Sequence, residues 1–178
     1  MNILIISSNL IGDSILSTGV IKEFINKYPD SKLTIIVGPS AAQVYKNFPK
    51  INKLIVIKKQ KFSLHWIRIW KKCFFYKWDI IIDFRSSLIS YFFLKKKKYI
   101  FKHSNDTNQI NQLTKFFKLK NIAYPIIFNN SFEKISAKNK LLKYKKYIVI
   151  APGGNWKPKI WPIENFNKLL IKLLHKHS

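Results

Sequence analysis

The first candidate for chemistry is an aspartate between an apolar run and a helical pattern. Residues Ile3–Ile6 are apolar, the polar loop Ser7–Asp13 follows, and a helical pattern runs from about Ser14 to Tyr28. In an open α/β sheet, ligands bind in the loops that leave the carboxyl ends of the strands. The helix dipole also favours a carboxylate at this position. Asp13 is therefore either a catalytic carboxylate or an ordinary helix cap, a role that aspartate often takes.

The second candidate is the loop 151–162. It follows the strand-like run Tyr147–Ile150 and precedes a helical pattern. Gly153 and Gly154 would let the backbone approach a ligand closely, and exposed N–H groups with a cation such as Lys159 would suit a phosphate. The spacing matches neither the Walker A motif nor the dinucleotide-binding glycine motif. A purely structural glycine-rich turn is the alternative.

Arg85 is a third candidate, because it follows the strand-like run Ile80–Asp83. It should then lie at the same edge of the sheet as Asp13, where it could contact an anion. The four histidines show no metal-ligand spacing with carboxylates or with Cys73, so no metal site is predicted.

These candidates need a sheet to position them, and the pattern of the chain predicts one. Short β-branched runs alternate with segments of helical spacing, which predicts a parallel sheet with helices on both faces. A lysine-rich helix should follow at about 132–143. The runs are Ile3–Ile6, Leu33–Val37, Leu54–Ile57, Ile80–Asp83 and Tyr99–Phe101, and the helical segments are 14–28, 40–47, 62–75, 86–94 and 107–118.

The net charge of +25 has two possible interpretations. It indicates an anionic partner, such as nucleic acid, a phosphorylated lipid or a membrane surface, or it reflects a lysine-rich coding bias, since Arg68 and Arg85 are the only arginines. Tyr91–Leu94 followed by Lys95–Lys98 could likewise dock on an anionic membrane or form a core helix end with a solvated turn.

The cysteine content and the distribution of apolar residues indicate the cellular compartment of the protein. A single cysteine, Cys73, excludes an internal disulfide framework and fits a reducing compartment. The amino terminus lacks the pattern of a signal peptide, and no apolar stretch approaches the length of a membrane-spanning helix. We therefore expect a cytoplasmic protein.

Taken in order, these motifs resemble glycosyltransferase family nine, the heptosyltransferases of lipopolysaccharide core assembly. The resemblance covers the whole chain. Its motifs are Gly12-Asp13, Ser17-Thr18, Tyr28-Pro29-Asp30, Trp78–Ser87, Pro152-Gly153-Gly154, Lys159-Ile160-Trp161-Pro162 and Glu164-Asn165-Phe166.

The resemblance implies a GT-B glycosyltransferase with two facing Rossmann-like domains. Residues 1–130 would be the acceptor-binding domain, 131–146 a linker helix, and 147–178 the first strand, loop and helix of a truncated donor-binding domain. Family members continue through further strand–helix units, so the chain is expected to be a fragment of a longer enzyme or a shortened gene product.

The chemistry implied by the resemblance is an inverting, metal-independent and cofactor-free sugar transfer. Asp13 would be the general base, and Lys159 would neutralise the donor diphosphate. Gly12, Arg85, Gly153, Gly154 and Asn155 would complete the substrate contacts.

The implied partners are a nucleotide-sugar donor such as ADP-heptose and an anionic glycolipid acceptor, with the protein at the inner face of the cytoplasmic membrane. A non-catalytic remnant that binds an anionic sugar or lipid is the alternative. A nucleic-acid binder has only the charge in its favour, because the aromatic residues fall mostly on predicted core positions.

Overall fold

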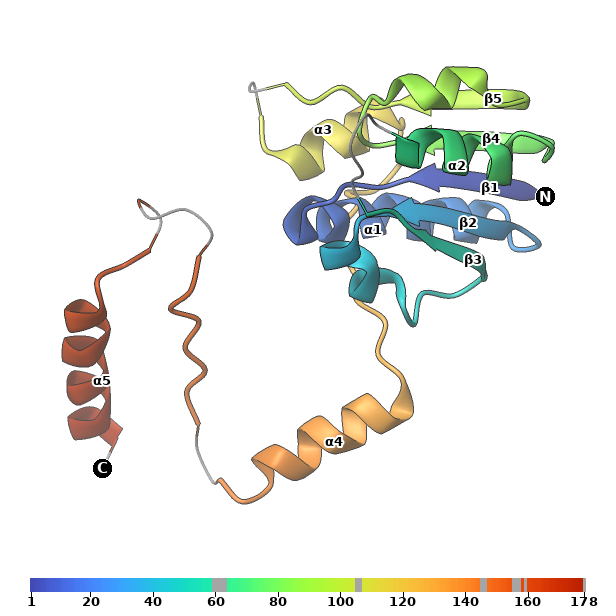
Figure 1. The fold of residues 1–178 in the computed structure, drawn as a ribbon. Coiled ribbons are helices and arrows are strands. Elements are labelled where there is room, and N and C mark those ends of the chain that lie inside the picture. The colour runs from blue at the N-terminus through green and yellow to red at the C-terminus, as the bar shows by residue number, and fades with distance from the viewer. Residues whose placement is uncertain (59–63, 105–106, 145–146, 155–157, 159, 178) are drawn as a thin grey trace. The chain divides into compact units, whose positions relative to one another are not determined.

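The computed structural model describes residues 1–178 except 59–63, 105–106, 145–146, 155–157, 159 and 178, and it gives only the backbone of 64–66, 68, 176 and 177. The chain divides into two compact units, Met1–Asn130 and Ser131–Ser178. The first unit carries a sheet with its helices, and the described residues of the second include the helices α4 and α5 (Figure 1).

A parallel sheet of five strands forms the centre of the first unit, as the alternating pattern predicts. The central strand β1 lies between β2 and β4, and its residues Ile3–Ile6 are completely buried. The strands are β1 (Asn2–Ile6), β2 (Lys32–Val37), β3 (Ile51–Val56), β4 (Trp78–Asp83) and β5 (Lys95–Ile100), in the order β3-β2-β1-β4-β5.

Helices cover both faces of this sheet, which confirms the predicted Rossmann-like α/β class. On one face, α1 (Ile11–Lys27), α3 (Gln109–Phe116) and the 3-10 helix η1 (Pro39–Tyr45) enclose a core. On the other, α2 (Leu64–Cys73) and the 3-10 helix η3 (Leu88–Phe92) enclose a second core. Side chains of β1 alternate between these cores, because neighbouring residues of a strand point to opposite faces.

The lysine run Lys95–Lys98 differs from its prediction. The interpretation of these residues as a solvated turn before a strand at Tyr99–Phe101 is wrong, because they form most of β5, whereas docking on an anionic membrane stays a prediction. Within the part of the chain that the structure describes, β5 is an edge strand of the sheet and pairs with β4 alone. Lysines suit such an edge because their charge opposes pairing with a further strand.

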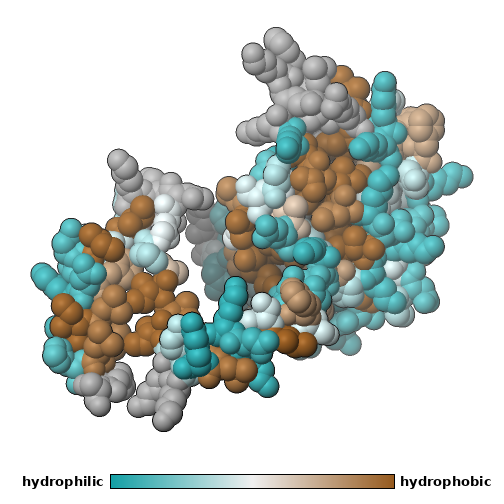
Figure 2. All heavy atoms as spheres, turned by 60° about the horizontal axis from the view of Figure 1, so that its bottom comes forward, coloured by the Kyte–Doolittle hydropathy of each residue, from teal (hydrophilic) through white to brown (hydrophobic). Residues whose placement is uncertain are grey.

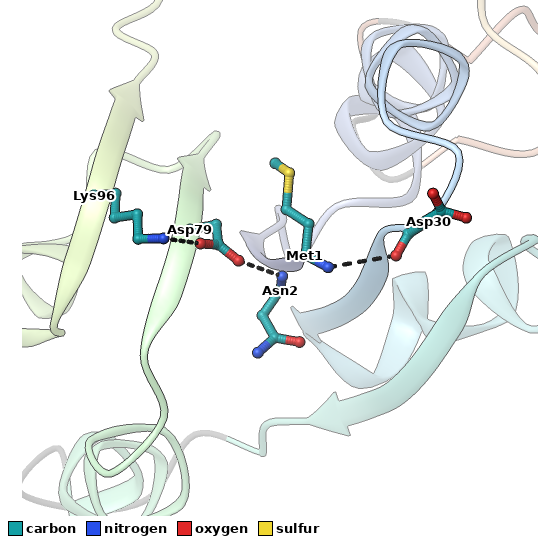
Figure 3. Close-up of polar contacts among 5 residues, drawn as sticks. All are labelled: Met1, Asn2, Asp30, Asp79 and Lys96. Carbon is teal, nitrogen blue, oxygen red and sulfur yellow. Dashed lines mark hydrogen bonds and ion pairs between the residues drawn. The ribbon is translucent and has the colours of Figure 1, made fainter.

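A polar cluster ties the amino ends of three strands together (Figure 3). The backbone N–H of Asn2 donates to Asp79 Oδ2 at 2.8 Å, and Lys96 Nζ lies 2.9 Å from Asp79 Oδ1. The terminal ammonium of Met1 donates to the carbonyl of Asp30 at 3.4 Å. The Asn2 hydrogen bond and the Lys96 ammonium hold the pKa of the Asp79 carboxyl below its ordinary value.

Asp79 should therefore stabilise the fold only where it is ionised. A group whose pKa is lowered by folding contributes stability above its unfolded pKa, about 3.9, and loses it as the pH falls through the folded value. We expect Asp79→Asn to lower the free energy of unfolding by about 1 kcal/mol at pH 7, since the pair is partly solvated. Urea unfolding at pH 7 and pH 3 tests this, and an equal difference at both pH values would contradict it.

The second unit contains α4 (Ser131–Leu141) and α5 (Ile163–His177), which correspond to the two predicted helices. The strand predicted at Tyr147–Ile150 is wrong: within the described residues nothing pairs with this segment, so no strand forms. Apolar residues lie at the surface of this unit (Figure 2), and Ile163, Ile171 and Leu174 of α5 are more than half exposed. The division of the unit into a linker and the start of another domain stays a prediction.

Candidate functional site

The loop that leaves β1 brings the predicted aspartate to the carboxyl edge of the sheet. Helix α1 begins at Ile11, not at the predicted Ser14, so Gly12 and Asp13 lie in its first turn. Leu10 is the N-cap and makes no side-chain cap. Asp13 is half-buried and its Oδ2 accepts a hydrogen bond from Ser8 Oγ at 3.1 Å. It is thus an acid of the first turn and not the N-cap of the helix.

Asp13 lines a small pocket of about 220 Å³. The pocket gathers the residues that follow three neighbouring strands, together with the starts of α1 and α3. Its lining residues are Ser8, Asp13, Ser17, Phe84, Phe101, His103 and Gln109. Sequence reasoning dismissed His103 because it has no metal-ligand spacing. The rule that ligands bind beyond strand ends would have found it, since it follows β5 by three residues.

Gly12 is exposed at the start of α1. Apart from its chain neighbours and the backbone of α1 itself, no described atom lies within 4 Å of the position that a Cβ would occupy there. Packing against the protein therefore does not explain this glycine, and its surface is open to a ligand.

The loop after β4 holds Arg85 at the same edge, as predicted. The buried Asp83 carboxylate fixes this loop, because it accepts hydrogen bonds from the backbone N–H groups of Arg85 and Ser87, both at 2.8 Å, and from Ser87 Oγ at 2.6 Å. Ser86 takes a left-handed backbone with φ of 52°, and its Oγ donates to the Phe101 carbonyl at 2.7 Å. Such conformations persist only where the surroundings hold them.

Arg85 is linked to the Asp13 loop through Asn9. Arg85 Nη1 donates to Asn9 Oδ1 at 3.4 Å, and Asn9 is the neighbour of Ser8, which binds Asp13. Gly38 makes room for this arrangement, since a Cβ there would lie within 3.0 Å of Asn9 atoms. The structure therefore brings Gly12, Asp13 and Arg85 to one edge of the sheet.

A buried network of hydroxyl groups supports the start of α1. The sequence analysis did not predict this network. Tyr45 Oη lies 2.6 Å from Ser7 Oγ and 3.1 Å from Ser17 Oγ, and it donates to the Ser14 carbonyl at 3.2 Å. Burial raises the pKa of the Tyr45 phenol. A neutral, hydrogen-bonded network of this kind holds the first turns of a helix in one position.

The residues predicted for a donor phosphate belong to the second unit. Gly153 and Gly154 are exposed, and among the described residues Ile160 Cγ1, at 3.4 Å, lies near the position of a Cβ on Gly154. Asn155 and Lys159 lie outside the described residues. No group of three His, Cys, Asp or Glu residues that could hold a metal ion occurs among the described residues, and no described helix is long and apolar enough to cross a bilayer.

Comparison with solved structures shows that glycosyltransferases share this fold. A family 9 glycosyl transferase from Veillonella parvula aligns over 93% of this chain and 57% of its own, with 19% identity and a TM-score of 0.68. The E. coli heptosyltransferase WaaC with ADP-2-deoxy-2-fluoro heptose aligns over 97% and 65%, with 14% identity and a TM-score of 0.70. The E. coli ADP-heptose lps heptosyltransferase II aligns over 99% and 62%, with 14% identity and a TM-score of 0.68.

The likeness to these structures is a likeness of fold. The sequence identities are 14–19%. The resemblance suggested by the sequence motifs is therefore confirmed for the fold. The chain spans 57–65% of the length of the three structures. No protein-family model matches the sequence, and none of the curated proteins compared with it matches either.

Proposed function

We propose that the chain acts as a glycosyltransferase of the heptosyltransferase type, which transfers a sugar from a nucleotide-sugar donor to a glycolipid of the cell envelope. The observation that carries this proposal is the Asp13 carboxylate in a pocket at the carboxyl edge of the sheet, in a fold shared with heptosyltransferases. Open α/β sheets bind their ligands at this edge.

In the proposed reaction, Asp13 is the general base. It takes the proton from an acceptor hydroxyl while that oxygen forms a bond to the anomeric carbon of the donor. The bond from this carbon to the nucleoside diphosphate breaks on the opposite side, and the diphosphate leaves with the electron pair, which inverts the anomeric centre. The hydrogen bond from Ser8 Oγ would orient the carboxylate.

The donor is proposed to be a nucleotide sugar of the ADP-heptose kind. Solved structures of the E. coli heptosyltransferase WaaC contain ADP and ADP-2-deoxy-2-fluoro heptose, which supports this assignment. Gly153, Gly154 and Asn155 would lie against the diphosphate. Lys159 would neutralise the charge that develops on the leaving group, which is how fixed cations accelerate such transfers.

The acceptor is proposed to be a phosphorylated glycolipid such as the lipopolysaccharide core. Gly12 and Arg85 would contact it beside Asp13. The net charge of +25 would favour an anionic lipid and hold the protein at the inner face of the cytoplasmic membrane.

A transfer assay tests this function. The chain is incubated with ADP-heptose, or with other nucleotide sugars in parallel, and with a phosphorylated lipid-linked sugar in detergent, and released nucleoside diphosphate is measured. We expect release that depends on the acceptor. If the chain binds the acceptor in calorimetry but releases no diphosphate from any donor, it is a non-catalytic module that binds anionic glycolipids.

A further inference from the structure

A second hollow, larger than the Asp13 pocket, lies between α2 and η3. Its volume is about 650 Å³, within the range of about 300–1,000 Å³ that is usual for small-molecule sites. Among the described residues, its lining is apolar except for one cation and one hydroxyl. The lining residues are Ile67, Trp70, Arg85, Ser87, Leu88, Ile89 and Phe92.

The apolar side chains of this hollow are unusually exposed. Leu88 is 79% exposed, Phe92 65% and Ile67 53%. Apolar side chains gathered in one exposed hollow mark a binding groove more often than scattered ones do. Part of the lining is held in place, because Ile89 is buried in the second core and the ring centroids of Trp70 and Phe74 lie 4.3 Å apart.

Arg85 gives the hollow a charged wall and connects it to the Asp13 loop. Arg85 is one of the lining residues, and its Nη1 donates to Oδ1 of Asn9, the neighbour of Ser8. The chain of contacts from the hollow to Asp13 therefore runs through Arg85, Asn9 and Ser8. An apolar surface beside an arginine complements an amphiphile that has an apolar tail and an anionic group.

We infer that the α2–η3 hollow binds an alkyl or acyl chain of an anionic lipid, with Arg85 against its phosphate. That this lipid is also the sugar acceptor rests on the proposed function. In that case the hollow would hold the apolar part of the acceptor and leave its sugar at Asp13, so the hollow would select lipid-linked over free sugars.

Binding of octyl, decyl and dodecyl phosphate, each below its micelle concentration, tests the inference by calorimetry. Each additional methylene that is buried should raise the association constant about fourfold. Inorganic phosphate should bind far more weakly than dodecyl phosphate. Affinity that is independent of chain length, or equal affinity for inorganic phosphate, would overturn the inference.

Two variants with a matched control locate the site. Phe92→Ser should weaken dodecyl phosphate binding about tenfold, whereas Phe75→Ser, which removes an 85% exposed ring outside the hollow, should not. Arg85→Gln should weaken dodecyl phosphate but leave the neutral dodecyl maltoside unchanged. Thermal melts check that the variants fold. Equal losses in Phe92→Ser and Phe75→Ser would show that the lipid binds elsewhere.

These measurements need no nucleotide sugar, so their outcome is separate from that of the transfer assay. Chain-length-dependent binding without transfer would support the lipid site and reject the proposed function. Transfer to a lipid acceptor that Phe92→Ser leaves unchanged would support the function and reject the hollow as the site of the acceptor's apolar part.

Discussion

Replacing Asp13 by Asn is expected to lower the rate of sugar transfer by about 10²–10⁴-fold, the contribution usual for a general base. Asparagine has nearly the same shape and can still accept the hydrogen bond that Ser8 Oγ donates, so the loop should keep its position. The amide has no basic oxygen for the acceptor proton, so the loss should fall on kcat more than on KM for either substrate.

A second Asp→Asn exchange serves as the matched control. Asp79 lies at the amino ends of β1, β4 and β5, away from the carboxyl edge that carries Asp13. Asp79→Asn should therefore change the stability but not the turnover. Both variants are assayed for diphosphate release at saturating donor and acceptor. Turnover by Asp13→Asn equal to that of the unaltered chain would remove Asp13 as the base.

The sheet and the location of the candidate site could be predicted from the sequence because they depend on burial alone. The runs Ile3–Ile6 and Leu33–Val37 are short, rich in β-branched residues and apolar at every position or nearly so, which is typical of a strand buried on both faces. Parallel strands then bring their following loops to one edge. Asp13 and Arg85 both lie at this edge for that reason, although they are 72 positions apart in sequence, and Asn9 links Arg85 to the Asp13 loop.

The features that the sequence did not reveal depend on neighbours that are distant in the chain. Lys95–Lys98 has the composition of a turn and becomes a strand because β4 offers a partner. Tyr147–Ile150 has the composition of a strand and forms none, because no described strand pairs with it. Tyr45 was predicted only as part of a helix, and its role in the hydroxyl network depends on Ser7 and Ser17.

Gly19→Ala is expected to cause a large loss of stability, although it adds only one methyl group to α1. A Cβ at Gly19 would lie closer than 3.0 Å to the backbone carbonyls of Ala123 and Tyr124, and backbone atoms cannot rotate aside as a side chain can. The segment is also tied to the helix, because the Ile126 N–H donates to Thr18 Oγ1 at 2.9 Å. We expect a loss of about 3 kcal/mol, as for severe overpacking of a core.

Gly12→Ala is the matched control in the same helix, since no described atom apart from its chain neighbours and the backbone of α1 lies within 4 Å of its Cβ position. It should leave the free energy of unfolding unchanged or raise it by less than about 1 kcal/mol, because alanine favours helix more than glycine does. Urea unfolding followed by circular dichroism compares the two variants. If Gly19→Ala is no less stable than Gly12→Ala, the segment 123–126 does not pack against α1 in solution. A loss confined to Gly19→Ala would instead show that this close backbone approach holds α1, and with it Asp13, against the rest of the unit.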